Sequence, residues 1–301
     1  MQPPPRPSFA PRHWPGWIGI GIAWFAAQWP WALQRALGRG LGMLAFALAA
    51  SRRRAARVNL ALCYPERDAR ERERIVRAHF AALGIGVFEF ARAWWGSIAP
   101  MRKTVRIDGL GHLQAAVATG RGVLLISGHF LNLEICGRLL CDHVPLAGMY
   151  RPHRGAVMEW AVLRGRQRYA TAMFRQRELR PAIRLLKQGG VLWYAPDQDM
   201  HGRDVVFAPF FGIPAASITA THQLARMTGC AVLPFFHHRE GDRYVLRIGE
   251  AFADFPSGDA VADTARVNAS IEAMVREAPE QYLWVHRRFK RRPEGEPPIG
   301  Y

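Results

Sequence analysis

Cysteine is scarce in this chain of 301 residues, and its placement is not that of a metal or disulfide framework. The four cysteines form no C-x-x-C pair and no even ladder of spacings. This pattern argues against a small disulfide scaffold and against a cysteine-ligated zinc module. The cysteine pattern is that of a protein in reducing, cytosolic surroundings. Since 50% of the residues are apolar, we also expect the chain to bury a substantial core.

Lysine and the acidic residues are also under-represented. Only three of the 41 basic residues are lysines, and 24 acidic residues leave a formal net charge of +17. A charge of this size indicates an anionic partner, which could be nucleic acid, an anionic membrane surface, an acidic protein or a phosphorylated substrate. The arginine bias suits phosphate recognition, although a biased genome composition gives the same result.

Several well-known catalytic and nucleotide-binding motifs are missing. No G-x-S-x-G elbow occurs, so Ser127 is interpreted as a small strand residue and not as a nucleophile. The glycine-rich stretches "GIGIAW" and "GRGLGM" do not complete a dinucleotide fingerprint, and no Walker loop is present. The sequence therefore gives no sign of serine hydrolase, dinucleotide or nucleoside triphosphate chemistry.

The N-terminal segment has the composition of a membrane anchor. Residues 14–34 carry no charge, include five tryptophans and are long enough to cross about 30 Å of hydrocarbon as a helix. A second apolar stretch, residues 40–51, is too short to cross and is expected in the interface. Arginines concentrate after the first stretch, which predicts a single-pass membrane protein with its large C-terminal part in the cytoplasm. A cleaved signal peptide or a buried core helix is the alternative.

We expect residues 1–51 to form this anchor and interfacial segment, and residues 52–301 to form one cytoplasmic domain. Apolar spacing predicts a long amphipathic helix over residues 69–95. Beyond it, apolar runs of strand length alternate with helical patterns, which predicts an α/β domain with a mixed sheet flanked by helices. The expected strands are residues 122–127, 146–150, 191–195, 231–236 and 244–248, the last two as a hairpin, with helices at residues 131–140, 155–174, 180–188 and 217–227.

The strongest candidate for chemistry is an H-x4-E motif at the end of the first predicted strand. His129 follows Gly128, which lets the backbone bend and a ligand approach closely. Glu134 stands among apolar neighbours and needs a partner, so we expect it to orient His129 as a general base. The alternative is a core histidine bonded to Glu134. The same spacing at His237 and Asp242 crosses a predicted turn and is interpreted as accidental.

Other candidate residues lie at the ends of further predicted strands. Asp197 and Asp199, in "APDQD", could coordinate a metal, position an arginine or simply form a turn. Arg151 ends another strand, and Arg164 and Arg166 lie on the helix that follows it. Arginines at these places can hold a phosphate or stabilise an oxyanion. The C-terminal run "WVHRRFKRR" is basic and aromatic, and its simpler interpretation is a solubilising tail.

Five segments together resemble the late acyltransferases of lipid A biosynthesis, whose fold is that of the lysophospholipid acyltransferases. They occur in order along most of the chain, and the glutamate at position 134 is typical of the lipid A branch. The sequence "APDQDMHGRD" stands where glycerophosphate acyltransferases have a "PEGTRS"-type loop, which argues against a phospholipid acceptor. The five segments are "SGHFLNLE", "MYRP", "WYAPDQD", "FFGIPAA" and "PEQYLWVHRRFKRRPEG".

The resemblance implies transfer of a fatty acyl group from acyl carrier protein to a hydroxyacyl chain of the lipid A precursor Kdo-lipid IVA. The acyl group expected from the resemblance is lauroyl. In this interpretation His129, Glu134, Arg166 and Asp197 are catalytic. No metal, nucleotide or other cofactor is required, because the thioester of the donor is already activated. Arg151, Arg164 and Asp199 are the expected substrate-binding residues.

Two other functions remain open at this stage. An acyltransferase of the same superfamily that acts on another glycolipid or on an amino-acid lipid would share the H-x4-E motif. A membrane-tethered nucleic-acid-binding protein would account for the charge, but no recognition motif accompanies it. We therefore expect no nucleic acid among the partners, and expect acyl carrier protein, the lipid precursor and the inner membrane.

Overall fold

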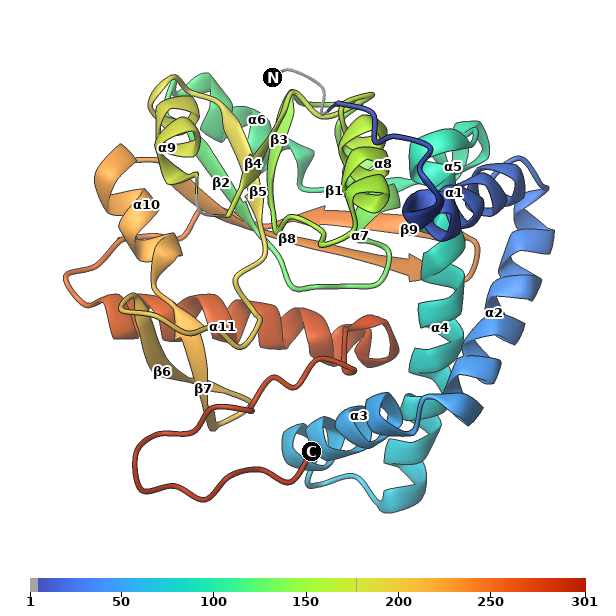
Figure 1. Cartoon of the computed structure of the whole chain (residues 1–301). Helices are drawn as coiled ribbons and strands as arrows, with labels where there is room; N and C mark the ends of the chain where they lie inside the picture. Colours follow the sequence, from blue (N-terminus) through green and yellow to red (C-terminus); the bar gives the residue numbers. More distant parts are fainter. Residues whose placement is uncertain (1–4, 177) are drawn as a thin grey trace.

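A seven-stranded sheet lies at the centre of the computed structural model, which describes residues 5–176 and 178–301 (Figure 1). The strand order is β1-β9-β8-β2-β5-β3-β4, and all neighbours are parallel except β8 and β9. The expected α/β class with a mixed sheet flanked by helices is confirmed. The strands are β1 (Arg106–Asp108), β2 (Val123–Ile126), β3 (Leu146–Tyr150), β4 (Ala172–Arg175), β5 (Val191–Tyr194), β8 (Ala231–Glu240) and β9 (Arg243–Ile248).

Strand β2 lies in the interior of the sheet and is buried on both faces. Leu124 and Ile126 belong to one apolar cluster, while Val123 and Leu125 belong to another on the opposite face, as the alternation of side chains along a strand requires. Parallel strands covered on both faces are apolar throughout, which explains why this run is visible in the sequence.

The helices are α1 (Trp14–Ala26), α2 (Trp31–Leu48), α3 (Ala50–Cys63), α4 (Ala69–Trp95), α5 (Ala99–Thr104), α6 (Leu110–Ala118), α7 (Leu133–Leu140), α8 (Ala156–Arg166), α9 (Leu179–Lys187), α10 (Ala220–Thr228) and α11 (Ala260–Glu277).

Helix α4 has the bounds expected from its apolar spacing, Ala69–Trp95. It begins with a capping box, in which Asp68 accepts a hydrogen bond from the Glu71 N–H at 2.8 Å and the Glu71 carboxylate accepts one from the Asp68 N–H. Helix α2 packs directly on α4 through glycines. A Cβ on Gly84 would lie 2.0 Å from the Gly38 carbonyl oxygen, so the two backbones are in contact.

The single membrane-spanning helix expected over residues 14–34 is not formed. Helix α1 ends at Ala26, and Pro30 precedes the first residue of α2. Proline lacks an amide hydrogen and has a fixed φ, so it starts a new helix here and does not continue the old one. Within the described residues, no helix is both long and apolar enough to cross a membrane. The boundary predicted between residues 51 and 52 falls inside α3.

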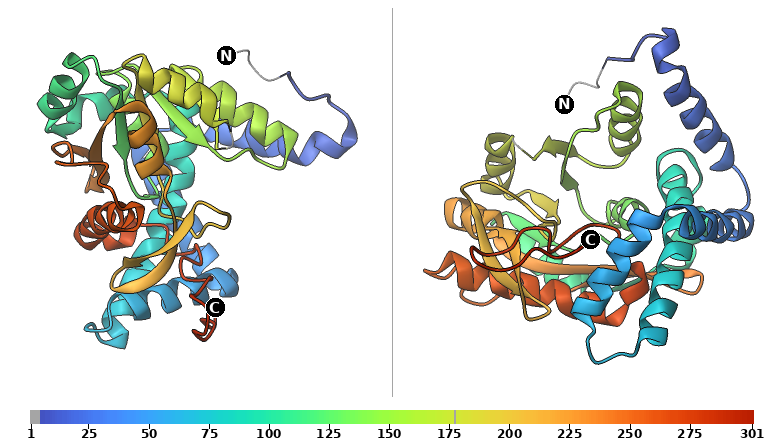
Figure 2. Two further views of the ribbon diagram at one scale, coloured as in Figure 1. Left: turned by 90° about the vertical axis from the view of Figure 1, so that its left-hand side faces the viewer. Right: turned by 60° about the horizontal axis from the view of Figure 1, so that its bottom comes forward.

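Helices α1 and α2 carry exposed apolar side chains, on α1 on more than one side, since Trp24 is also exposed and only Ala26 is buried, and on α2 mainly along one face. On α2 this face is opposite the buried Gln34, Gly38 and Gly42, which face α4. Helix α1 lies at one edge of the molecule and contacts α8 (Figure 2). We call this surface the N-terminal apolar stripe, made of Trp14, Ile18, Ile22, Phe25, Leu33, Leu37, Leu41, Leu44 and Leu48.

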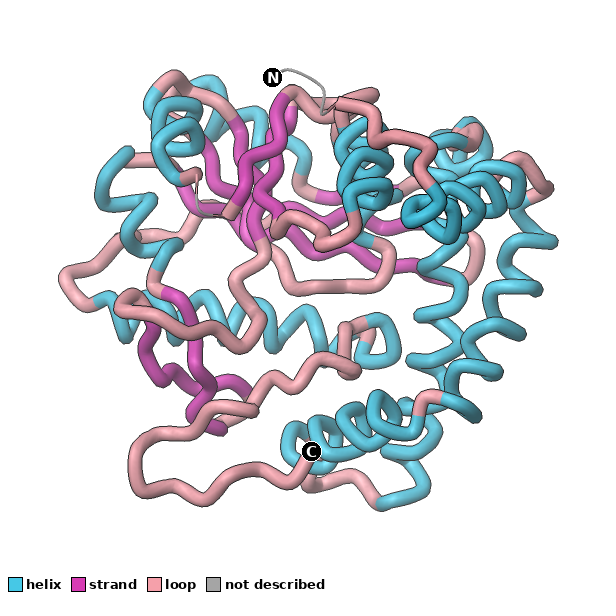
Figure 3. Tube along the Cα trace, viewed as in Figure 1, coloured by secondary structure: helices cyan, strands magenta, loops and turns pink. Residues whose placement is uncertain are grey.

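Some elements differ from those expected. The helix predicted over residues 155–174 ends at Arg166, and the edge strand β4 takes up the last part. Apolar spacing alone does not separate a short strand from the continuation of a helix. A second, two-stranded antiparallel sheet of β6 (Val205–Phe210) and β7 (Ile213–Ile218) lies apart from the main sheet and packs against α11 (Figure 3). Neither this sheet nor α11 was expected.

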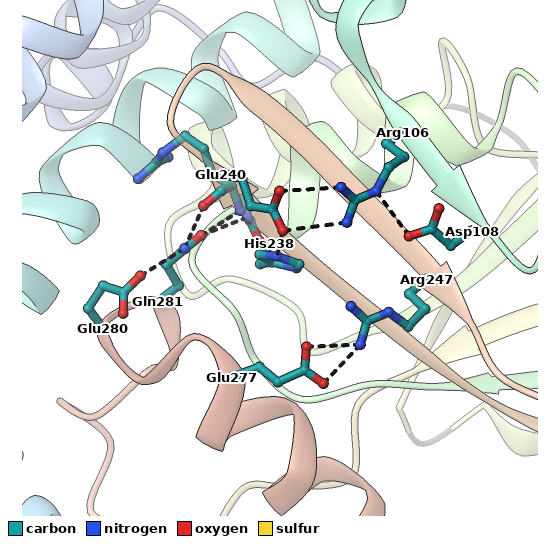
Figure 4. A network of polar contacts seen from close by, with 10 residues as sticks. Arg106, Asp108, His238, Glu240, Arg247, Glu277, Glu280 and Gln281 are labelled. Atoms are coloured by element: carbon teal, nitrogen blue, oxygen red, sulfur yellow. Dashed lines mark hydrogen bonds and ion pairs between the residues drawn. The ribbon is translucent and has the colours of Figure 1, made fainter.

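The C-terminal segment returns to the loop that follows β2. The 3-10 helix η2 (Pro279–Gln281) is held against β8, because the Gln281 amide accepts from the Arg239 N–H at 2.8 Å and donates to the Arg239 carbonyl at 2.9 Å (Figure 4). The Leu131 N–H donates to the Gln281 carbonyl, and the Leu283 N–H donates to the His129 carbonyl. The loop after β2 is thereby joined to the C-terminal segment by backbone hydrogen bonds.

Candidate active site

The loop after β2 brings His129 against Asp197, which follows β5. The distance between His129 Nδ1 and Asp197 Oδ1 is 2.5 Å. The backbone N–H of His129 donates a second hydrogen bond to the other carboxylate oxygen, Oδ2, at 2.8 Å. Two bonds to one carboxylate fix both the backbone and the ring of the histidine.

This pairing follows from the register of the sheet. Strands β2 and β5 are parallel neighbours, and Ile126 is aligned with Tyr194. His129 and Asp197 each come three residues after that aligned pair. Because the carboxyl ends of parallel strands meet at one edge of the sheet, equivalent positions in the two following loops come together there.

The arrangement leaves one imidazole nitrogen available. Asp197 is an acceptor, so His129 Nδ1 carries the proton of that bond. In the part of the chain that the structure describes, His129 Nε2 has no hydrogen-bond partner, and the side chain is 30% exposed. Asp197 is 1% exposed. A neutral imidazole with a free Nε2, oriented by a buried carboxylate, is the geometry of a general base.

The charges of the pair reinforce each other. Burial by itself lowers the pKa of His129, but the charge and hydrogen bond of Asp197 outweigh burial and raise the pKa above its ordinary value. Burial likewise raises the pKa of Asp197, yet the charge of His129 and hydrogen bonds from His129 and Tyr282 bring it well below its usual range. Asp197 is therefore ionised at any physiological pH.

Glu134 does not orient His129, in contrast to the expectation from the sequence. It lies in the first turn of α7, 2% exposed, and its hydrogen bonds go to residues of α4, α8 and the loop after α8. Burial raises the pKa of Glu134, but the Arg166 charge and hydrogen bonds outweigh burial and lower it. We call this group the Glu134 cluster: Glu134 accepts from Arg166 Nε at 2.8 Å, from Trp94 Nε1 at 2.8 Å and from the Tyr169 hydroxyl at 2.9 Å.

Residues 6–291 match the family described as bacterial lipid A biosynthesis acyltransferase. The chain is 38% identical to the lipid A biosynthesis lauroyltransferase of Escherichia coli K12, over 95% of each chain. The chain belongs to this family. The family assigned from the five motifs is confirmed, and the protein is an acyltransferase.

Other relatives differ in the acyl group that their names carry. The lipid A biosynthesis palmitoleoyltransferase of Escherichia coli K12 is also 38% identical, over 95% of this chain and 94% of that one. The myristoyltransferase of the same organism is 27% identical, over 95% of this chain and 90% of its own length. The crystal structure of the 1-acyl-sn-glycerophosphate acyltransferase PlsC of Thermotoga maritima matches 83% of this chain and 98% of its own, with 16% identity and a TM-score of 0.40.

The remaining expected site residues of the acyltransferase lie in different surroundings. Asp199 is ion-paired with Arg291, and its N–H donates to His286 Nε2 at 2.9 Å. Of the roles considered from the sequence, which were metal coordination, positioning of an arginine and a simple turn, the structure agrees with the second. Arg151 and Arg164 are exposed, and Arg166 is in the Glu134 cluster. Within the described residues, no three His, Cys, Asp or Glu side chains are grouped so that they could hold a metal ion.

His237 lies beside the candidate site, a placement that was not expected from the sequence. Its Nδ1 lies 2.9 Å from the Asn132 amide oxygen, and its Nε2 lies 3.0 Å from Ser127 Oγ. Asp242, which shares the H-x4-D spacing with His237, does not contact that histidine and is ion-paired with Arg35. Burial lowers the pKa of His237 to about 3, helped by the charges of His238 and His129, so the ring is neutral and braces the loop that carries His129. The pairing of β8 with β2, in which Ile126 is aligned with Pro234, brings His237 to this loop, and the sequence alone does not give that pairing.

The basic C-terminal run is part of the folded acyltransferase and not a solubilising tail. Arg288 is 2% exposed and donates to the Ala216 carbonyl and to Ser217, both in β7. His286 and Arg291 hold Asp199, as described above. The run therefore fixes the loop after β5, on which Asp197 stands.

Proposed function

We propose that this acyltransferase moves a fatty acyl group, laurate in the first instance, from acyl carrier protein to a hydroxyacyl chain of the lipid A precursor Kdo-lipid IVA. The observation that carries the proposal is the His129–Asp197 pair with its free Nε2. The names of the 38% identical relatives support the pathway. Because those names differ in acyl group, laurate is only one candidate, and palmitoleate and myristate are the others.

The reaction needs one proton carrier. His129 Nε2 takes the proton of the acceptor hydroxyl as its oxygen attacks the thioester carbonyl, and Asp197 stabilises the imidazolium that forms. The new C–O bond is made, the C–S bond breaks, and the imidazolium returns its proton to the departing thiolate of the carrier. The thioester is already activated, so the step balances without a further reactant.

Glu134 and Arg166 support this step from a distance in our proposal. They join α7, which follows the His129 loop, to α8 and α4. Arg151 is exposed directly after β3 and is proposed to contact a phosphate of the acceptor. Asp199 is proposed to act through Arg291 rather than on the substrate.

We further propose that the protein works at the cytoplasmic face of the inner membrane, with the N-terminal apolar stripe in one leaflet. Helix α1 has 13 residues and is about 20 Å long. Arg39 is exposed on α2, and the chain carries a net charge of +17. Amphipathic helices flanked by arginine lie in the interface of anionic bilayers in this way. The same charge suits the acidic acyl carrier protein.

Mass spectrometry of the lipid product tests the function. Purified protein is incubated with Kdo-lipid IVA and with acyl carrier protein loaded with 12-, 14- or 16-carbon chains. We expect addition of one acyl group, and a loss of at least about 100-fold in rate for His129→Ala. His143→Ala, at an exposed histidine after α7, is the control and keeps native turnover. Transfer to another glycolipid but not to the precursor would contradict the proposed acceptor, and full activity of His129→Ala would contradict the proposed base.

A further inference from the structure

A hollow of about 370 Å³ lies between α8 and the C-terminal end of α4. This volume falls in the range of roughly 300–1,000 Å³ that is typical of small-molecule sites. The hollow adjoins the Glu134 cluster, since Trp95 lines it while the preceding residue, Trp94, donates to Glu134. Its lining residues are Trp95, Trp160, Ala161, Arg164, Gln167 and Arg168.

Two positive charges border this hollow without a carboxylate beside them. In the described part of the chain, the Arg164 guanidinium has no hydrogen-bonded or ion-paired partner, although many other arginines of the protein are paired with Asp or Glu. Arg168 donates to the Trp94 carbonyl oxygen at 2.5 Å, which is a neutral partner. Two uncompensated guanidinium groups at one concave surface fit an anion, and their planar donor geometry suits phosphate.

The rest of the lining is suited to a sugar ring. The indoles of Trp95 and Trp160 are partly buried, and Trp160 is held edge-on against Trp17 of α1 with ring centroids 5.2 Å apart. Indole faces pack against the C–H bonds of a pyranose. The side-chain nitrogen of Gln167 is buried and has no hydrogen-bond partner among the described residues. A buried donor of this kind needs an acceptor, which a sugar hydroxyl or ring oxygen supplies.

We propose that this hollow binds a phosphorylated pyranose, with Arg164 and Arg168 on the phosphate, the two indoles on the ring and Gln167 on a hydroxyl. That this sugar belongs to the lipid acceptor rests on the proposed function. The location agrees with it, because Gly16 of α1 packs against Val157 of α8, which places the hollow beside the N-terminal apolar stripe. A lipid headgroup in the hollow would thus lie next to the leaflet that holds its acyl chains.

Direct binding tests the site without the reaction. Saturation-transfer NMR with full-length protein and glucosamine 1-phosphate is expected to show transfer to the pyranose protons. Arg164→Gln weakens this binding about tenfold or more, as the loss of a charge-assisted bond to phosphate does. The matched control is Arg184→Gln, which removes the same charge from an exposed position on α9 and leaves binding unchanged. Inorganic phosphate and N-acetylglucosamine each bind more weakly than the sugar phosphate.

Trp160→Leu reduces the transfer to the ring protons while inorganic phosphate still binds, which separates the indole contact from the charge contact. Circular dichroism and the melting temperature establish that each variant is folded. Equal binding of inorganic phosphate and the sugar phosphate would overturn the role of the indoles. Equal effects of Arg164→Gln and Arg184→Gln would overturn the site as a whole.

Steady-state kinetics then connect the site with the acceptor. We expect Arg164→Gln to raise KM for the lipid acceptor about tenfold, with kcat and the KM for acyl carrier protein within twofold of native. A rise in KM for acyl carrier protein instead would assign the arginine to that partner and contradict the proposal. If glucosamine 1-phosphate binds as expected but Kdo-lipid IVA is not acylated, the sugar site stands and the proposed function fails.

Discussion

His129 and Asp197 stand at equivalent places beyond two paired strands, three residues after the aligned residues Ile126 and Tyr194. His237 occupies the corresponding place on the other neighbour of β2, three residues after Pro234. His129, its carboxylate partner Asp197 and the buried His237 that braces the loop of His129 are thus brought together by the parallel register of β8, β2 and β5. Sequence separation plays no part in this arrangement.

Asp197→Asn should reduce acyl transfer by at least about 100-fold, by analogy with other histidine–carboxylate pairs in which the amide holds the ring in a less suitable tautomer. The amide nitrogen can donate to Nδ1, which leaves Nε2 protonated and unable to accept. The initial rate of product formation, measured by mass spectrometry, gives the comparison. Asp204→Asn, at an exposed carboxylate later in the same loop, serves as the control, and we expect it to lose far less. An Asp197→Asn enzyme as fast as native would show that the carboxylate is dispensable.

Glu134→Gln should destabilise the fold, because it leaves the buried Arg166 guanidinium without its charged partner. Breaking a buried ion pair from one side costs about 3–5 kcal/mol. The free energy of unfolding in urea is the measurement. Glu73→Gln removes the exposed partner of Arg57 and should cost less than about 1 kcal/mol. Similar losses in the two variants would mean that the Glu134 cluster is not a stabilising element.

Gly84→Ala and Gly42→Ala should separate α2 from α4. The added Cβ atoms would lie 2.0 Å from the carbonyl oxygens of Gly38 and Phe80, respectively, so backbone must move. Overpacking of this kind costs about 1–3 kcal/mol or more. Gly40→Ala, on the exposed face of α2 with nothing within 4 Å, should instead stabilise the protein by up to about 1 kcal/mol through helix propensity. Thermal unfolding distinguishes the two groups, and equal melting temperatures would contradict the contact.

The N-terminal apolar stripe should control binding to lipid. Ile22→Glu combined with Leu41→Glu places two charges in the proposed leaflet and should lower partition into vesicles containing anionic lipid at least tenfold, because a charge in hydrocarbon costs several kcal/mol. Co-sedimentation measures the bound fraction. Val261→Glu is the control, since Val261 is 45% exposed on α11, comparable with 42% for Leu41. Unchanged sedimentation of the double variant would exclude the stripe as the membrane surface.

Much of the fold could be predicted because many of its helices and strands have a characteristic apolar pattern in the local sequence. The run Val123–Ile126 is apolar throughout because both faces of β2 are covered, and α4 has an unbroken helical period and a capping box. Strand β4 was missed because it continues the apolar spacing of α8. The anchor was predicted from composition alone, whereas the chain forms two helices, α1 ending at Ala26 and α2 beginning directly after Pro30.

The site was only partly predictable for a related reason. His129 could be recognised from Gly128 and its apolar surroundings, and Asp197 from the family motif. The pairing of His129 with Asp197 could not be predicted, because it depends on the strand order. In the sheet, β2 lies beside β5 and not beside β3, the next strand in the sequence. Glu134 was assigned to His129 because the two are close in sequence. Helix α7 begins at Leu133 and turns Glu134 towards α4 and α8 instead.

The pH dependence of kcat/KM for native enzyme, Asp197→Asn and Glu134→Gln tests most directly which carboxylate serves His129. Since the base must be neutral and its pKa is raised, native activity should fall as the pH falls through a value above 6.5, the ordinary pKa of histidine. Removing the Asp197 charge should shift this acid limb to lower pH by about one unit or more. Glu134→Gln should leave its position unchanged. A limb that moves in Glu134→Gln and stays in place in Asp197→Asn would contradict the account.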